Sequence, residues 1–192
     1  MGDVALQCEC GKVKGSINSA TPSSGLNVVC CCSDCQQFAV WLEQQSTVLD
    51  QFGGTQIYQT SMSQLTLHEG AEQLRCMRLS PGGLLRWYSG CCNTAIGNTM
   101  KASVPFIGVI HSFINVSDMQ EHLGPVRAYV QTQDAVGEPD YPYSAKKFPA
   151  GITLRIIRKM ISWRVRGMHK PSVFFGKDGR PVSKPVIAGV DN

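Results

Sequence analysis

The residues of this chain best suited to chemistry are cysteines. The sequence holds nine, and seven of them form three short blocks of candidate metal ligands: Cys8 and Cys10, then Cys30, Cys32 and Cys35, then Cys91 and Cys92. Cysteine thiolates at such spacings bind zinc in tetrahedral sites. Three thiolates from one short loop can hold one side of a zinc ion and leave its fourth position free, as in a catalytic rather than a structural site. The middle block therefore predicts a zinc site with catalytic potential.

The first block supplies only half of a tetrahedral site. Cys8 and Cys10 lie on a predicted strand that enters a turn at Gly11, so two further thiols must come from elsewhere in the chain. Cys91 and Cys92 are the expected donors. Because successive side chains of an extended chain point in opposite directions, adjacent cysteines both reach one metal only where the backbone turns sharply. The spacing leaves open whether both of them bind or only one.

Metal binding explains these cysteines better than disulfide bonding does. Neighbouring cysteines such as Cys30, Cys31 and Cys32 are awkward disulfide partners, and an odd total leaves at least one thiol unpaired. Reduced thiols indicate a cytoplasmic protein. The first residues lack the basic and apolar regions of a secretion signal, and no apolar run is long enough to cross a bilayer. We therefore expect a cytoplasmic location and no membrane partner.

The first half of the chain has the pattern of a β domain. Between Val4 and Met100, short runs of β-prone residues alternate with turns that contain proline or glycine. This pattern predicts a mainly β fold of antiparallel sheets. Only the segment from Ser33 to Leu42 shows a helical period. A chain of 192 residues, 43% of them hydrophobic, can build its core without disulfide bonds.

The predicted β domain ends near residue 123. The run from Pro105 to Ile114 predicts one more buried strand, and a short helix up to Leu123 is expected with Ser117 as its N-cap. We assign residues 1–123 to a zinc-binding β domain and residues 124–192 to a C-terminal extension on the same globule.

The extension contains one strong helical pattern. An irregular, proline-rich connection is expected up to Pro149. Apolar residues then recur on one side of a helix: Ile152, Ile156, Ile157, Met160, Ile161 and Trp163. This period predicts an amphipathic helix near 152–166, which Gly167 ends and whose apolar side packs on the β domain.

Positive charge is concentrated in the same extension. Lys146 to Lys184 holds eleven of the eighteen Lys and Arg residues of the chain, with a single acid, Asp178. Such a segment can bind nucleic acid or another anionic partner. Aromatic side chains that would stack on bases are few here, so nucleic acid is not the favoured partner.

Taken together, the cysteine blocks resemble the glutathione-dependent formaldehyde-activating enzyme family, whose superfamily also includes centromere protein V. The resemblance spans Ala5 to Asn98. It rests on Gly-Lys-Val-Lys-Gly after the first block, on Cys30-x-Cys-Ser-Asp-Cys, and on Arg86-Trp-Tyr-x-x-Cys-Cys-Asn-Thr. It implies a zinc-binding assembly of sheets called the β-tent. By this resemblance Cys8, Cys10 and the late block hold a structural zinc, while Cys30, Cys32 and Cys35 hold a catalytic one.

The resemblance also implies an activity. Members of the family are carbon-sulfur lyases that join the thiol of glutathione to formaldehyde as S-hydroxymethylglutathione. Cys30, Cys32 and Cys35 would then be catalytic residues, a small thiol such as glutathione the substrate, and one or two zinc ions the cofactor. The alternative is a non-catalytic zinc module whose basic extension binds nucleic acid or another anionic partner.

Two departures from the family pattern concern the sites. Cys31 stands where the family usually has histidine, and it could be a spare ligand, a redox partner or a buried filler. The family's late block is Cys-x-x-Cys-Gly-Thr, and its alignment on Cys92 puts Ser89 in the place of the first cysteine. Cys91 or Cys76 could supply the missing ligand. Cys91 is favoured because it is already tethered beside the site.

Overall fold

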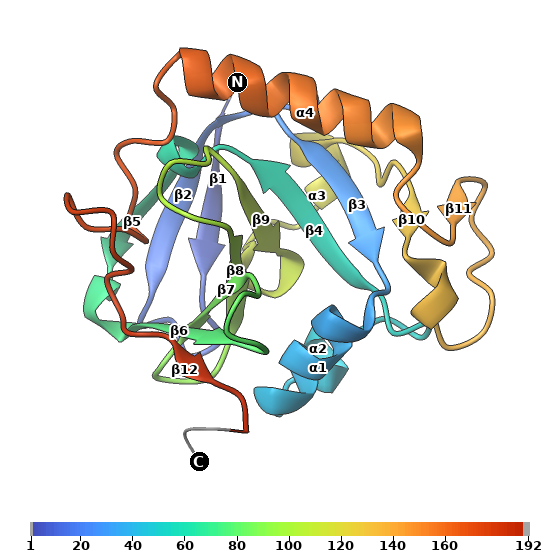
Figure 1. The fold of residues 1–192 in the computed structure, drawn as a ribbon, viewed down its shortest axis with the longest axis horizontal. Coiled ribbons are helices and arrows are strands. Elements are labelled where there is room, and N and C mark those ends of the chain that lie inside the picture. Colours follow the sequence, from blue (N-terminus) through green and yellow to red (C-terminus); the bar gives the residue numbers. More distant parts are fainter. Residues whose placement is uncertain (1, 190–192) are drawn as a thin grey trace.

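The computed structural model describes residues 2–189 and shows two sheets with helices at opposite ends of the strands (Figure 1). The smaller sheet has three antiparallel strands in the order β1-β2-β5. These strands are β1 (Gly2–Gln7), β2 (Lys14–Ala20) and β5 (Leu65–Glu69). The prediction of a mainly β fold is confirmed.

The larger sheet has nine strands in the order β11-β10-β3-β4-β9-β8-β7-β6-β12. They are β3 (Leu26–Cys30), β4 (Thr55–Thr60), β6 (Leu74–Arg78), β7 (Leu85–Ser89), β8 (Ala95–Thr99), β9 (Ile107–Ile110), β10 (Tyr129–Val130), β11 (Ser144–Ala145) and β12 (Val186–Ile187). Its central pairings are antiparallel, as expected. The sheet is nevertheless mixed, because β10 runs parallel to β3 and β11, and β12 runs parallel to β6. Long connections from the C-terminal segment permit these parallel pairs.

The helices are α1 (Ser33–Trp41), α2 (Gln45–Val48), α3 (Met119–Leu123) and α4 (Ala150–Val165). Helix α1 confirms the helical period between Ser33 and Leu42. The expected cap of α3 is wrong by one residue. Asp118 rather than Ser117 caps this helix, since its carboxylate accepts hydrogen bonds from the backbone N–H groups of Gln120 and Glu121.

Helix α4 lies across one end of the strands, and α1 and α2 lie at the other end of β3 (Figure 1). Trp163 is buried, and Ile156 packs partly buried against the core. The expectation that the whole apolar side faces the β domain is wrong, since Ile157 and Ile161 are 45% and 59% exposed. A helix that crosses the ends of strands contacts them along a narrow stripe only.

Buried side chains form two clusters, and each contains cysteines. One cluster surrounds Trp87 and includes Cys8, whereas the other lies beneath α1 and includes Cys30 and Cys35. The division at residue 123 stays a prediction, and residues 190–192 of the extension lie outside the described part. None of the helices within residues 2–189 combines the length and apolar character needed to cross a bilayer.

Candidate metal centres

The structure brings the first and last cysteine blocks together in one group of four: Cys8, Cys10, Cys91 and Cys92. The sulfur atom of Cys8 lies 3.7 Å from that of Cys10 and 3.8 Å from that of Cys91. The sulfur atoms of Cys91 and Cys92 lie 3.9 Å apart. Around a tetrahedral ion with metal–sulfur bonds of about 2.3 Å, neighbouring sulfurs lie about 3.8 Å apart. The Cys10–Cys91 pair is closer, at 3.3 Å. The four thiols therefore fit a tetrahedral ion of the size of zinc.

A turn between β1 and β2 presents the first pair. The backbone N–H of Cys8 donates to the carbonyl of Val13, and Gly11 takes a positive φ of 75° that closes the turn. The N–H of Val13 donates to the sulfur of Cys8 at 3.2 Å. Burial nevertheless raises the pKa of the Cys8 thiol, and this hydrogen bond opposes the effect by favouring the thiolate form.

The turn between β7 and β8, called the late turn below, contains Cys91 and Cys92, and Ser89 stabilises it. Ser89 is buried, its hydroxyl accepts a hydrogen bond from the N–H of Thr94 at 3.0 Å, and it lies 3.2 Å from the sulfur of Cys92. Asn93 has a φ of 57°, in the left-handed region that asparagine tolerates better than most residues. The sharp turn lets adjacent Cys91 and Cys92 reach the same group. Ser89 thus braces a turn that brings Cys91 and Cys92 into the same candidate metal group.

Hydrogen bonding favours the thiolate at Cys92. Burial raises the pKa of the Cys92 thiol, but hydrogen bonds from Ser89 and Thr94 outweigh this effect and lower it to about 6. Burial, followed by hydrogen bonds with Cys10 and Cys8, raises the pKa of Cys91 to about 12. Without a metal, a thiolate at Cys92 therefore lies beside the protonated thiol of Cys91, and metal binding would release that proton.

Cys30, Cys32 and Cys35 form the second group, with their sulfur atoms within 4.8 Å of one another. Cys30 ends β3, Cys32 directly precedes α1, and Cys35 lies in its first turn. Among residues 2–189, no further cysteine, histidine, aspartate or glutamate belongs to this group.

Two further cysteines lie outside both groups. Cys31 is fully buried, and its backbone N–H donates to the carbonyl of Val130. Cys31 could be a spare ligand, a redox partner or a buried filler, and its burial agrees with the last of these roles. Cys76 is also buried, and its thiol is directed to the carbonyl of its neighbour Met77. Neither thiol completes a candidate metal site within the described chain.

The start of α1 favours a thiolate at Cys32. Hydrogen bonds from the thiols of Cys30 and Cys35, together with one from the backbone N–H of Cys35, lower the pKa of Cys32 to about 2. The same bonding raises the pKa of Cys30. Backbone N–H groups at a helix N-terminus stabilise a thiolate in this position. Cys32 is also the most exposed of the three residues.

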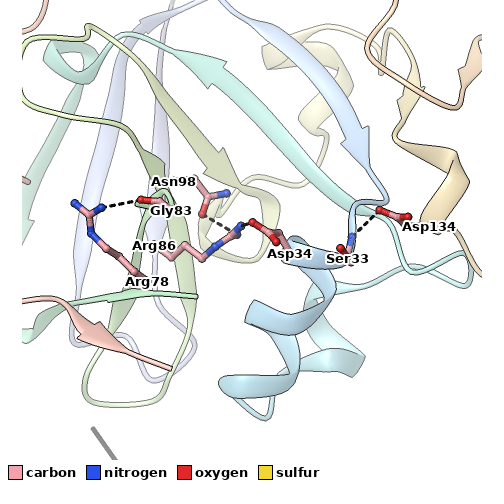
Figure 2. A network of polar contacts seen from close by, with 7 residues as sticks. All are labelled: Ser33, Asp34, Arg78, Gly83, Arg86, Asn98 and Asp134. Carbon is pink, nitrogen blue, oxygen red and sulfur yellow. Dashed lines mark hydrogen bonds and ion pairs between the residues drawn. The ribbon is translucent and has the colours of Figure 1, made fainter. Parts of the chain in front are cut away.

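A buried arginine lies beside this loop, and it is not among the site residues predicted from the sequence. Arg86 on β7 is 2% exposed, and its guanidinium lies 3.1 Å from the carboxylate of Asp34 and 3.4 Å from Asn98 Oδ1 (Figure 2). It also stacks over the ring of Phe38, at 5.5 Å from the centroid. After the hydrogen bonds from its neighbours, the charge of Arg86 further lowers the pKa of Cys32. The sequence could have indicated this residue, because an arginine within the apolar run Leu84-Leu85-Arg86-Trp87 needs a buried partner for its charge.

The C-terminal segment closes the other side of the loop. Asp134, in the turn η4 (Thr132–Asp134), accepts a hydrogen bond from the backbone N–H of Ser33 at 3.1 Å (Figure 2). The side-chain amide of Gln36 donates to the carbonyls of Cys31 and Asp134, both at 2.8 Å. These contacts fix the start of α1 and hence the positions of Cys32 and Cys35.

Comparison with known proteins gives a family but no activity. No curated protein matches the chain. A crystal structure of a Rhodobacter sphaeroides protein, determined in structural genomics work, is similar to 64% of this chain and 96% of its own, with 17% identity and a TM-score of 0.44. The model of a family described as "Family of unknown function (DUF6151)" matches residues 1–185, and the chain belongs to that family.

Proposed function

We propose that the protein is a zinc-dependent carbon-sulfur lyase that acts on a glutathione-type thiol adduct such as S-hydroxymethylglutathione. The observation that carries the proposal is the inequality of the two cysteine groups, with four thiols in one and three in the other among the described residues. Four thiolates complete a structural site, whereas three leave one position for a substrate. The resemblance of the cysteine blocks to the formaldehyde-activating family supplies the reaction class.

The donor sets support zinc as the metal, because sites built from several thiolates suit zinc and leave hard cations such as magnesium poorly bound. A zinc ion bound at Cys30, Cys32 and Cys35 would hold an incoming thiol as its thiolate. In the addition, the sulfur of glutathione bonds to the carbon of formaldehyde and the thiol proton ends on the oxygen. The lyase direction reverses both changes.

Arg86 gives the loop a charge balance suited to this role. Three thiolates exceed the charge of a zinc ion by one negative charge, and a fourth thiolate would add another. The buried guanidinium offsets part of that excess in a region where water screens charges poorly. Arg86 is therefore a positioning and charge-balancing residue in this proposal.

Metal counting tests whether the two groups are separate sites. We expect two zinc ions per wild-type chain, measured by mass spectrometry of the metal after exhaustive dialysis. Cys32→Ser should reduce this to one. Cys31→Ser, in the same loop but outside the group, is the matched control and should retain two.

Cobalt substitution tests the open position. When reduced glutathione is added at millimolar concentration, we expect the visible spectrum of the cobalt-loaded protein to change as a fourth sulfur binds, and Cys32→Ser to remove that response. The enzyme should also accelerate exchange between formaldehyde and S-hydroxymethylglutathione, followed by NMR. A fully cobalt-loaded protein whose spectrum ignores glutathione would refute the proposal.

A further inference from the structure

A cavity of about 730 Å³ lies beside α4 and is lined by several cations. Three cations of the helix, Arg155, Arg158 and Lys159, line it together with Arg166, the C-cap of the helix. The other lining residues include Ser23 and Ser24, which share one turn, and Gln64. Among the residues that the structure describes, no aspartate or glutamate lines this cavity. Its volume lies within the roughly 300–1,000 Å³ typical of small-molecule sites.

The helical repeat explains why these cations share one side. Residues three, four and seven positions apart lie on the same face of a helix, and Arg155, Lys159 and Arg166 follow this spacing. The ammonium of Lys159 donates hydrogen bonds to the carbonyls of Ser23 and Ser24, which ties the helix to the turn. It also lies 5.9 Å from the ring centroid of buried Trp163. These four cations form what we call the cationic wall of the cavity, and Lys159 anchors it to the core.

The charges of this wall are not neutralised within the protein. The ion pairs found in residues 2–189 are Lys14–Glu69, Arg86–Asp34 and Arg180–Asp178, so none involves α4. The side chains of Arg155 and Arg158 form no hydrogen bond with the residues that the structure describes. Burial, followed by the charges of Arg155 and Arg166, lowers the pKa of Lys159. An anion in the cavity would relieve this repulsion.

We propose that the cavity binds a small molecule that carries two phosphate groups. A phosphate ester carries about −1.5 to −2 charges near neutral pH, so two of them match four cations. Arginine guanidinium groups bind phosphate oxygens through paired hydrogen bonds. The outward face of α4 beside the cations exposes Ile157, Ile161 and Val165, which are poor neighbours for the phosphate backbone of a nucleic acid. The concave shape and this apolar border favour a small ligand.

This site is separate from the cysteine groups and does not depend on the proposed zinc chemistry. The cavity adjoins the turn that precedes β3, whereas Cys30 ends this strand beside α1 (Figure 1). Five residues of strand separate the two ends by roughly 13–17 Å. The phosphate ligand would therefore bind at the opposite end of the strand from the cysteine loop.

Titration calorimetry of the full-length, zinc-loaded protein tests the proposal, with fructose bisphosphate as probe and fructose as the uncharged control. We expect saturable binding of one bisphosphate per chain and none of fructose. The double variant Arg155→Gln and Arg158→Gln should weaken binding by about tenfold or more. The control Lys147→Gln and Arg164→Gln removes the same charge outside the cavity and should change the affinity by less than about twofold.

Amide shifts of the wild-type protein provide a second measurement that needs no variant. Fructose bisphosphate should shift backbone signals of α4 and of residues 21–25. Shifts centred on the cysteine groups would overturn the proposal, as would absence of saturation or equal weakening by the two double variants. Binding of duplex DNA without binding of the bisphosphate would assign the cations to nucleic acid instead.

Discussion

Replacing Asp34 by asparagine tests how the buried cation beside the cysteine loop is stabilised. The guanidinium of Arg86 is 2% exposed and lies 3.1 Å from Asp34, whose side chain is 56% exposed. Asparagine keeps the shape and an oxygen acceptor but removes the negative charge. Arg86 would then keep two neutral contacts, Asn98 and the ring of Phe38, and its electrostatic interaction with Cys32.

The geometry sets the size of the effect. Two unit charges 3.1 Å apart interact by about 5 kcal/mol at an effective dielectric constant of about 20. Water reaches more than half of the Asp34 side chain and screens the pair, which reduces the expected loss to about 2–3 kcal/mol. This exceeds the usual value for a surface ion pair because one partner is buried and cannot be hydrated.

Urea unfolding at neutral pH with saturating zinc measures this difference in the free energy of unfolding. Asp178→Asn is the matched control, because its ion pair with Arg180 is longer, at 3.7 Å, and exposed on both sides. We expect the control to lose less than about 0.5 kcal/mol. If Asp34→Asn costs no more than Asp178→Asn, Asp34 is not the counter-charge of Arg86 and the electrostatic reasoning for the loop is wrong.

Three further predictions concern the late turn and the core. In metal-free protein, the rate of alkylation of Cys92 should rise with the fraction of thiolate, with a midpoint near pH 6. Ser89→Ala should move this midpoint to higher pH, because the thiolate loses a hydrogen bond. Peptide mass spectrometry measures both. Asn93→Val should cost about 1–2 kcal/mol in urea unfolding, since a β-branched residue is strained at a φ of 57°, whereas Asn93→Gly should cost less than about 0.5 kcal/mol. Thr99→Val should cost about 1–3 kcal/mol in the same assay, because the buried indole N–H of Trp87 loses its acceptor at 2.9 Å, and a loss below 0.5 kcal/mol would contradict this.

Much of the fold and the group of Cys30, Cys32 and Cys35 could be predicted because their signals are local, whereas Cys91 and Cys92 were expected beside Cys8 and Cys10 only because a tetrahedral site needs further ligands. Cys30, Cys32 and Cys35 span six residues, so the chain itself keeps their thiols close. The alternation of short β-prone runs with turns indicated the strands, and the helical period indicated α1 and α4. Errors arose where neighbouring residues have similar propensities, as with Ser117 and Asp118, and only the backbone geometry decides between them.

The tertiary structure decided which distant residues complete each site. Cys10 and Cys91 are 81 positions apart, and Arg86 and Asp34 are 52 positions apart, so their contacts depend on how the strands and α1 pack. The same packing turns Ile161 outward and leaves the cations of α4 around a cavity.

The sequence by itself therefore determined that the chain carries cysteine groups suited to a metal on a mainly β scaffold, because spacing and alternation are short-range properties. Only the tertiary structure decided that one group has four thiols and the other three, and that Cys31 and Cys76 belong to neither. The physical reason is that a tetrahedral site needs ligands from several directions, and long-range packing brings those directions together.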